Sequence, residues 1–163
     1  MDYFWTPWRY QYVTHGAGTK SCVFCEIAAA GNDEEALVVQ RGEFNFVVLN
    51  RFPYTSGHAM VVPYAHLGAL EEMPDGALQE MTRLTQSLEA ALRRLYRASG
   101  INLGMNIGEA AGAGVAGHIH MHVLPRWVAD SNFMTVISET RVLPEDLATT
   151  WQRLRAGLQT PAK

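Results

Sequence analysis

Hydrophobic residues recur along the middle of the chain at spacings of three and four, which predicts a long helix over residues 74–99. At these spacings the side chains form a single apolar stripe on the helix surface. The stripe consists of Leu78, Met81, Leu84, Leu88, Leu92 and Leu95. Pro74 suits the first turn of this helix and Gly100 suits its exit, because helices favour proline where they begin and glycine just after they end.

Shorter apolar runs on both sides of the helix predict strands. Residues 36–40 and 44–50 are two such runs, and Gly42 between them predicts a turn. A third run covers residues 58–63, and a fourth covers residues 101–107 after the helix. Runs of this length, bounded by glycine and proline, are typical of strands.

Residues 118–123 alternate strictly between a histidine and an apolar side chain. Such alternation predicts a half-buried strand, in which successive side chains point to opposite faces. His118, His120 and His122 then share one face, with neighbours roughly 6.6 Å apart along the strand. Three imidazoles on one face bring no packing advantage. The pattern therefore favours a metal site, a site for acid–base or nucleophilic chemistry, or both.

The ends of the chain add three further predicted elements. Residues 22–30 predict a short helix that ends at Gly31. Residues 132–139 predict an extended segment, and Pro144 predicts the start of a last helix. The apolar residues of that helix are Leu147, Trp151, Leu154 and Leu158. This order of elements, without an internal repeat, favours an α+β domain in which helices cover an antiparallel meander.

Length and composition limit the class of protein. With 163 residues, of which 48% are hydrophobic, the chain is expected to form one domain with a buried core. The net charge is −3 and the 13 basic residues are scattered, which argues against non-specific binding of nucleic acid. No run reaches the roughly 18 apolar residues of a membrane span, so no membrane partner is expected.

The N-terminal region and the cysteines bear on the cellular compartment. The first residues lack the basic and apolar regions of a signal peptide, and the two cysteines are close neighbours. A cytoplasmic location without a structural disulfide is therefore expected. Residues 1–20 are rich in aromatic side chains, including Trp5 and Trp8. We expect this arm to pack onto the domain or onto another subunit.

Cys22 and Cys25 have the spacing at which two thiolates reach one zinc ion. A tetrahedral zinc site needs two more ligands, and because the chain has no further cysteine, histidines must supply them. His66, just after the third predicted strand, and His118 are the candidates. A redox-active cysteine pair and a pair of reduced, partly buried thiols are the alternatives.

A glycine-rich loop over residues 108–117 precedes the histidines. Glycines let the backbone approach a ligand closely, and successive N–H groups in such a loop can bind an anion. A glycine-rich turn between strands is also common without any ligand. Beside three imidazoles, a phosphate-binding loop indicates phosphoryl or nucleotidyl transfer. Neutral imidazole attacks phosphorus near pH 7 and also leaves readily.

The run over residues 118–124 resembles the histidine triad (HIT) motif, His-φ-His-φ-His-φ-φ with φ apolar, at every position. The resemblance spans roughly residues 22–140. It is carried by Cys22–Cys25, Asn50–Pro53, Ser56–His58, Val62–His66, Asn106–Gly108 and Pro125–Arg126. Residues 5–10 and 126–135 further resemble a bacterial subgroup near the fragile-histidine-triad branch. That subgroup includes diadenosine tetraphosphate phosphorylases and hydrolases.

The resemblance implies one HIT domain over residues 21–163, preceded by the aromatic arm. Its sheet would have five antiparallel strands per subunit, with helices packed against it. It also implies a homodimer, with a homotetramer as an option, a nucleotide substrate and no organic cofactor.

The resemblance also implies roles for the histidines. His120 would attack the α-phosphorus and form a nucleotidyl-histidine intermediate, while a backbone carbonyl holds its other ring nitrogen. His122 would contact the phosphate and assist the leaving group, and His58 would belong to the same network. Phosphate would resolve the intermediate in a phosphorylase, and water would resolve it in a hydrolase.

Further implied roles concern the metal and the substrate. Zinc would be structural, and its ligands would be Cys22, Cys25, His66 and His118. Asn50 would bind the ribose hydroxyls, and Phe46 or nearby apolar residues would wall the base. The α-phosphate would be oriented by Asn106 and by the backbone of Gly112, Ala113, Gly114 and Val115.

One stretch departs from the family pattern. Many relatives carry Gly-Gln-Ser/Thr-φ-x-His before the triad, and its polar side chains contact the leaving phosphates. Residues 112–117 read Gly-Ala-Gly-Val-Ala-Gly instead. Recognition of the leaving group would then fall on backbone N–H groups, or on Arg126, Asn132 or Arg9. An arginine near a strand end is, however, more often a surface ion-pair partner.

Three functions remain open from the sequence. The favoured function is a dinucleoside polyphosphate phosphorylase or hydrolase. The second is a nucleoside phosphoramidase of the smaller histidine-triad branch, which shares the first half-reaction but releases a P–N leaving group. The third is a zinc-stabilised nucleotide-binding protein without catalysis.

Overall fold

The computed structural model describes residues 21–130 and 145–159. The elements are α2 (Val23–Ala29), β1 (Val38–Arg41), β2 (Asn45–Leu49), β3 (Ala59–Pro63), the short 3-10 helix η2 (Leu70–Glu72), α3 (Asp75–Tyr96), β4 (Gly100–Gly104), the 3-10 helix η3 (Glu109–Ala111), β5 (Met121–Arg126) and α5 (Leu147–Gln159). The predicted arm over residues 1–20, the predicted segment over residues 132–139 and Pro144 lie outside the described residues.

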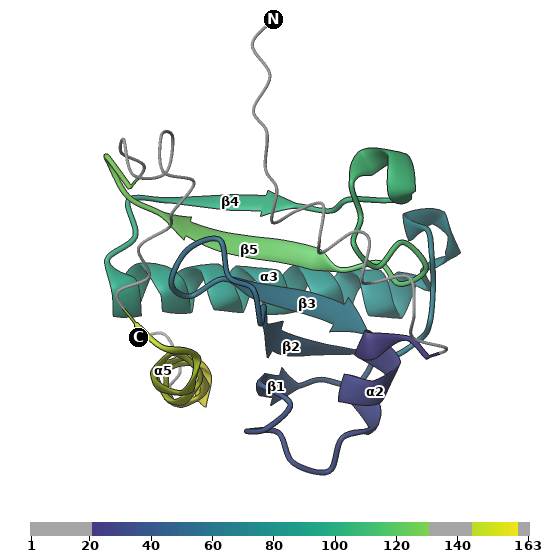
Figure 1. Cartoon of the computed structure of the whole chain (residues 1–163), viewed down its shortest axis with the longest axis horizontal. Helices are drawn as coiled ribbons and strands as arrows, with labels where there is room; N and C mark the ends of the chain where they lie inside the picture. Colours follow the sequence, from purple (N-terminus) through teal and green to yellow (C-terminus); the bar gives the residue numbers. More distant parts are fainter. Residues whose placement is uncertain (1–20, 131–144, 160–163) are drawn as a thin grey trace, which may run out of the picture.

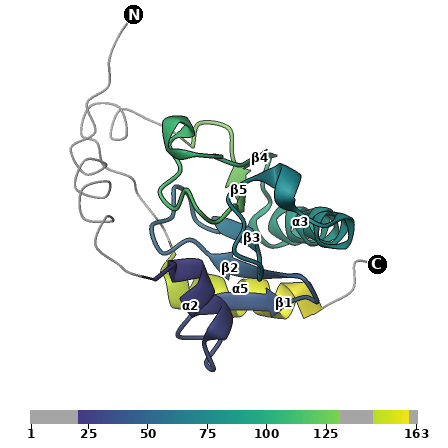
Figure 2. The same cartoon turned by 90° about the vertical axis from the view of Figure 1, so that its right-hand side faces the viewer.

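The five strands form one antiparallel sheet in the order β1-β2-β3-β5-β4. Helix α3 runs along one face of this sheet, whereas α2 lies on the other side, as Figures 1 and 2 show together. The predicted α+β class with a five-stranded antiparallel sheet is thereby confirmed.

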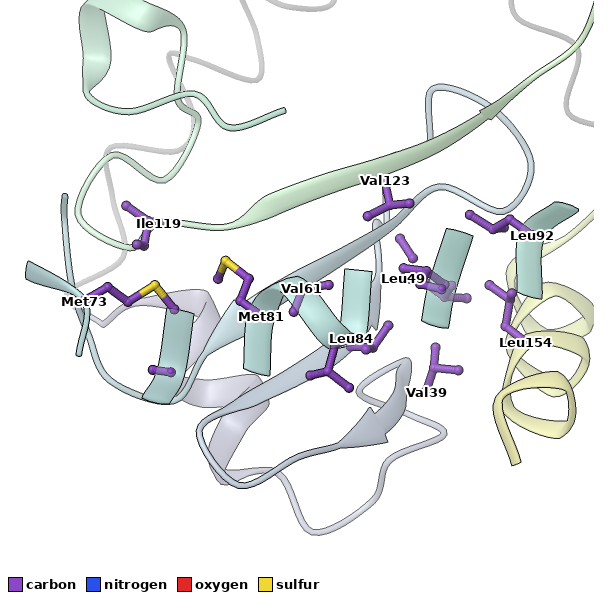
Figure 3. Close-up of a cluster of buried hydrophobic side chains, with 14 residues drawn as sticks. Val39, Leu49, Val61, Met73, Met81, Leu84, Leu92, Ile119, Val123 and Leu154 are labelled. Atoms are coloured by element: carbon purple, nitrogen blue, oxygen red, sulfur yellow. The ribbon is translucent and has the colours of Figure 1, made fainter. Parts of the chain in front are cut away.

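The larger of two apolar layers lies between the sheet and α3 (Figure 3). Val61 and Val123 point into it from β3 and β5, Met81 and Leu92 from α3, and Leu154 from α5. All five side chains are buried. Burying one such side chain contributes about 1.5–3 kcal/mol to folding, so this layer is a principal source of the stability of the domain.

The predicted stripe on α3 is largely confirmed, but Leu78 is exposed at 38% and Ala77 is buried in its place. Ala77 precedes Met81 by one helical turn, whereas Leu78 is rotated around the helix axis by about 100° from Ala77 and about 60° from Met81. The predicted exit at Gly100 is wrong. Helix α3 ends at Tyr96 because Arg97 adopts a left-handed conformation with φ of 50°, and Gly100 already belongs to β4.

A second apolar layer covers the opposite face of the sheet, beneath α2. Phe24 from α2 packs there with Phe46 and Val48 from β2 and Val62 from β3. Strands β2 and β3 are therefore buried on both faces, which explains why both read as continuous apolar runs rather than alternating ones.

The histidine segment is only partly a strand. Strand β5 begins at Met121, so of the three histidines only His122 lies within it. Met121 pairs with Val61, and β3 ends two residues later at Pro63, which has no N–H to extend the ladder. The prediction of a strand over residues 118–120 is therefore wrong.

The alternation of faces nevertheless holds through the segment. Ile119, Met121 and Val123 all pack with the layer beneath α3. The rings of His118 and His120 instead contact Phe24, on the other side of the sheet. The backbone of residue 119 is held by a hydrogen bond from its N–H to the Leu67 carbonyl, at 2.7 Å.

The predicted turn at Gly42 is present, and Glu80 of α3 ties it to the helix. The Glu80 carboxylate accepts hydrogen bonds from the backbone N–H groups of Glu43, Phe44 and Asn45 and from the Asn45 side chain, at 2.7–2.9 Å. Burial raises the pKa of Glu80, but these donors outweigh burial and hold the pKa below its usual value. The folded state therefore favours the ionised carboxylate.

Replacing Glu80 by alanine is expected to lower the free energy of unfolding by about 2–3 kcal/mol, because the buried Asn45 amide loses its charged acceptor. The lowered pKa means that this stabilisation is present at neutral pH and is lost as pH falls through the folded-state pKa. Urea unfolding of Glu80→Ala checks the prediction. Glu89→Ala, which removes only an exposed pair with Arg93, serves as the matched control and should change stability little.

Candidate functional site

Four side chains converge where α2 meets the ends of β3 and β5. Cys22 caps the N-terminus of α2 and Cys25 lies one turn later, whereas His66 follows β3 and His118 precedes β5. One ligand atom from each residue lies within 4.8 Å of the corresponding atoms of the others. The structure thus brings together the four residues that the sequence predicted as metal ligands.

The separations within this cluster fit a tetrahedral zinc site. The Cys22 Sγ atom is 3.3 Å from His118 Nδ1, and the Cys25 Sγ atom is 3.4 Å from His66 Nδ1 and 3.7 Å from His118 Nδ1. A tetrahedral zinc ion with ordinary Zn–S and Zn–N bonds places sulfur and nitrogen ligands about 3.6 Å apart. Two thiols and two imidazoles are also the ligand types that zinc prefers.

The hydrogen bonds of His118 leave its metal-facing nitrogen free to act as a ligand. Its Nε2 atom lies 2.8 Å from the Pro63 carbonyl oxygen, so Nε2 carries the proton and donates it. Burial lowers the pKa of His118, which favours the neutral ring. In that tautomer Nδ1 presents a lone pair toward the two cysteines, as a zinc ligand must.

His120 is held in the opposite tautomer. Its Nδ1 atom lies 2.9 Å from the backbone carbonyl oxygen of His118 and therefore donates its proton there. The ring is buried, and this burial lowers the pKa of His120, so the neutral form is favoured. The remaining Nε2 atom carries a lone pair, which is the form in which imidazole is a nucleophile.

A chain of hydrogen bonds through His58 determines which ring nitrogen of His122 carries the proton. The Tyr54 N–H donates to His58 Nδ1 at 3.1 Å, which places the His58 proton on Nε2. His58 Nε2 lies 2.9 Å from His122 Nδ1 and donates to it. A neutral His122 consequently carries its own proton on Nε2. His122 is thus a hydrogen-bond donor beside the nucleophilic His120, whose ring centroid is 4.8 Å away.

Acid is expected to destabilise the protein through His122. Burial, together with repulsion between the protonated forms of His122 and His120, lowers the pKa of His122 to about 4 from 6.5. The unfolded chain therefore binds this proton first. The stabilisation associated with neutral His122 is complete above pH 6.5 and is lost as pH falls toward 4, by on the order of 2–3 kcal/mol.

His122→Asn offers a test, since its amide retains an acceptor for His58 but does not titrate. Urea unfolding of both proteins at pH 7.5 and pH 4.5 should show a smaller loss of stability in the variant. Equal losses in the two proteins would contradict the assignment of this acid sensitivity to His122.

Asn50 lies at the same end of the sheet as His58. Its Nδ2 atom is 3.3 Å from His58 Nδ1, and its Oδ1 atom accepts the Phe52 N–H at 2.9 Å. Phe46, by contrast, is fully buried and packs against Tyr64. The predicted contact of Phe46 with a base is therefore not supported, because its ring offers no surface to a ligand.

Asn106 is partly buried in the segment after β4. In the glycine-rich loop that follows, two of the backbone N–H groups predicted to bind an anion instead donate to carbonyl groups of the same loop. The Gly112 N–H donates to the Glu109 carbonyl at 2.9 Å, and the Ala113 N–H donates to the Gly108 carbonyl at 3.3 Å. Gly112 has a φ of 83°, a left-handed conformation that favours glycine. Four residues were predicted to hold the α-phosphate through their backbone N–H groups. Gly114 and Val115 are the two that remain candidates for this role.

Arg126 makes an ion pair, which is the more common role of an arginine near a strand end. Its guanidinium contacts the Asp130 carboxylate through two nitrogens at 2.5 and 2.7 Å, and it donates to Asn102 Oδ1 at 3.0 Å. The other two arginine and asparagine candidates, Arg9 and Asn132, lie outside the described residues.

Two residues in the site had no predicted role. Phe24 contacts the rings of both His118 and His120, and its position between the two cysteines was the available sequence signal. Tyr54 donates to His58 through its backbone N–H, and its ring centroid is 4.8 Å from that of His58. Every residue other than proline has a backbone N–H, so the residue type of Tyr54 did not indicate that its backbone donates to His58.

Among the helices of the described residues, none is both long enough and apolar enough to cross a membrane.

Comparisons with known proteins identify relatives that share these features. The HIT domain model matches residues 32–128. The chain is 38% identical to an AP-4-A phosphorylase from Mycobacterium tuberculosis strain H37Rv, over 91% of this chain and 84% of the relative. It is 31% identical to an uncharacterised HIT-like protein from Saccharolobus solfataricus, over 69% of this chain and 79% of the relative.

Solved structures agree with this relationship. A zinc-bound histidine triad family protein from Mycobacterium smegmatis superposes with a TM-score of 0.69 at 32% identity, and the match covers 87% of this chain and 96% of the other. A HIT family protein from Bacillus subtilis gives 0.61 at 29% identity, with 68% and 76% covered. With the triad geometry, the family model and these relatives in agreement, the chain belongs to the histidine triad (HIT) family.

Proposed function

We propose that this protein is an enzyme that cleaves dinucleoside polyphosphates of the diadenosine tetraphosphate type at the α-phosphate. One observation carries the proposal: His120 is buried, which lowers its pKa and favours the neutral ring, and the His118 carbonyl accepts its Nδ1–H, so its Nε2 lone pair is available for attack. Similarity to an AP-4-A phosphorylase over most of both chains supports the choice of substrate class.

In the first half-reaction, His120 Nε2 forms a bond to the α-phosphorus of the substrate. The bond from that phosphorus to the bridging oxygen breaks, and the electron pair leaves with the oxygen. Diadenosine tetraphosphate then yields ATP as the leaving group and an adenylyl group on His120. Neutral imidazole suits this reaction because it is both a competent nucleophile and a good leaving group.

In the second half-reaction, an oxygen of phosphate or of water attacks the same phosphorus and the bond to His120 breaks. Phosphate gives ADP, and water gives AMP. His122 Nε2–H supports both steps by donating a hydrogen bond to the phosphate oxygens, where negative charge develops. His58 acts through His122, because its Nε2–H donates to His122 Nδ1 and so keeps the proton of His122 on Nε2.

The substrate is proposed to lie across the end of the sheet where these histidines meet. Asn50 is beside His58 and is proposed to bind the ribose hydroxyls. Asn106 and the backbone of Gly114 and Val115 are proposed to orient the α-phosphate. Arg126 could engage the leaving phosphates only by sharing its guanidinium with Asp130, so it is the weakest member of this set.

The cluster of Cys22, Cys25, His66 and His118 is proposed to hold a structural zinc ion, which supplies a cross-link between α2 and the ends of β3 and β5. With four protein ligands, such a site has no open position for substrate. A cytoplasmic location is proposed as well, because cysteines there stay reduced and remain able to bind a metal.

A homodimer is proposed as the working assembly, with a homotetramer as an option. Within the described residues, β4 forms an edge of the sheet, and Leu103 on this edge is half exposed. An edge strand with an exposed apolar residue is suited to pairing with another chain. Light scattering on the purified protein measures the oligomeric state.

The reaction is tested by product analysis with diadenosine tetraphosphate in the presence and absence of phosphate. ADP plus ATP indicates phosphorolysis, and AMP plus ATP indicates hydrolysis. No cleavage of the dinucleotide, together with rapid turnover of an adenosine phosphoramidate, would replace this proposal with the phosphoramidase function. Tight binding of AMP without turnover of either substrate would indicate a binding protein.

A further inference from the structure

We propose that Tyr54 is a positioning residue, which covers the hydrogen bond between His58 and His122 and so keeps His122 a neutral donor toward the phosphate. This inference deepens the proposed function, on which it rests for the role of His122. Tyr54 lies in the loop between β2 and β3. It contacts His58 twice: its backbone N–H donates to Nδ1 at 3.1 Å, and its ring centroid is 4.8 Å from that of His58.

The Tyr54 ring lies alongside the hydrogen bond between the two histidines. Its centroid is 6.2 Å from that of His122, with an interplanar angle of 23°, and the centroids of His58 and His122 are 5.1 Å apart. Together with the 4.8 Å between Tyr54 and His58, these separations close a compact triangle. The ring therefore covers the pair from the side and does not lie beyond its His58 end.

This cover matters because the hydrogen bond requires a neutral His122. His58 Nδ1 accepts from the Tyr54 N–H, and the amide nitrogen of Asn50 lies 3.3 Å from the same atom. The His58 proton therefore stays on Nε2 and points at His122 Nδ1, 2.9 Å away. A proton added to His122 Nδ1 would bring two donors face to face. The bond would break, and His122 would lose the contact that orients it.

Access of water decides how readily that proton is added. Burial is the largest cause that lowers the pKa of His122 to about 4, yet the residue is only partly buried. A ring beside the pair excludes water that would otherwise solvate the imidazolium. Tyr54 is itself 39% exposed, so it forms the outer cover of the pair. Its removal should therefore admit water without disturbing the core.

The other groups around His122 do not depend on Tyr54. Besides this tyrosine, the titratable groups in ring contact with His122 among the described residues are His58 and His120. Repulsion between the protonated forms of His120 and His122 also lowers the pKa of His122. The neighbouring strands place Met60 and Gly104 opposite His122, and neither carries a charge. A change at Tyr54 thus reaches His122 through water and through the bond from His58.

The test follows His122 by NMR in protein with isotope-labelled histidine and without substrate. It compares the wild type with Tyr54→Ala, Tyr54→Phe and Phe52→Ala, and the spectrum of His122→Asn identifies the His122 signals. We expect the pKa of His122 to rise by about one pH unit in Tyr54→Ala. Tyr54→Phe keeps the ring and should keep the wild-type pKa. Phe52, which is 63% exposed in the same loop, controls for loss of an aromatic ring and should also leave the pKa in place.

The activity should follow the spectra. The pH at which cleavage of diadenosine tetraphosphate falls on the acid side should shift toward neutral pH in Tyr54→Ala, by the same amount as the pKa. An unchanged pKa in Tyr54→Ala, or an equal rise in Phe52→Ala, would overturn the inference. So would a rise in pKa that leaves the acid side of the activity profile in place. Because the spectra need no substrate, a wild type that does not cleave the dinucleotide refutes the proposed function separately from the effect of Tyr54 on His122.

Discussion

Replacement of His120 by glycine is expected to reduce cleavage of diadenosine tetraphosphate by about 10³-fold or more. The reason is chemical. The His118 carbonyl holds the proton of His120 on Nδ1, so Nε2 keeps a lone pair for attack, and the ring lies beside His122. The other groups of the site can bind and polarise phosphate, but they do not supply this nitrogen–phosphorus bond. Initial rates with chromatographic separation of the nucleotides measure the loss.

Chemical rescue sharpens this test. Added imidazole can occupy the space that the missing side chain leaves, and it should restore part of the activity of His120→Gly by accepting the adenylyl group itself. Acid quenching of the wild type with substrate should trap one adenylyl group on the peptide that contains residues 118–122. His122→Gln, which keeps the nucleophile, should still form this adduct, although more slowly. Full cleavage by His120→Gly without imidazole would refute the mechanism.

The second large effect concerns the metal cluster. Zinc is expected to raise the free energy of unfolding of the wild type by about 4 kcal/mol when free zinc exceeds its Kd by about a thousandfold. The physical reason is that the ion cross-links α2 to the ends of β3 and β5, which the unfolded chain cannot reproduce. Thermal unfolding with zinc and with a chelator measures the effect.

Cys25→Ser provides the matched variant for this experiment. It removes the sulfur that lies within 3.7 Å of both histidine nitrogens, so zinc should stabilise the variant far less. Magnesium serves as the control ion, because it prefers oxygen ligands and should stabilise neither protein. A wild type that binds no zinc and readily forms a disulfide would instead support the redox interpretation of the two cysteines.

The larger elements were predictable because their patterns are local. The stripe from Met81 to Leu92 follows the helical repeat, so α3 could be located from the sequence within a few residues. The runs in β2 and β3 are continuous because both faces of these strands are buried. The misassigned positions, Leu78 and Gly100, lie at helix ends, where a small error in phase or length changes which residue is buried or which terminates the helix.

The histidine segment shows the limit of a local pattern. Alternation correctly gave the faces of residues 118–123, since Ile119 and Val123 enter the apolar layer beneath α3 whereas the rings of His118 and His120 contact Phe24 on the other side of the sheet. It did not give the strand boundary, because pairing depends on the partner. The partner strand β3 ends at Pro63, which lies more than fifty residues before His118 in the sequence. Likewise, the burial of Phe46 depends on what covers β2 and not on the residue itself.

The sequence by itself determined the chemistry that is available: three alternating imidazoles, a cysteine pair, and the histidines that could complete a metal site. These are properties of residue type and spacing, and they carry over directly into the fold. Only the tertiary structure supplied the contacts that set the three tautomers. The Pro63 carbonyl accepts from His118 Nε2, the His118 carbonyl accepts from His120 Nδ1, and His58 Nε2 donates to His122 Nδ1. Tautomer depends on the partner that folding supplies, and no residue pattern contains it.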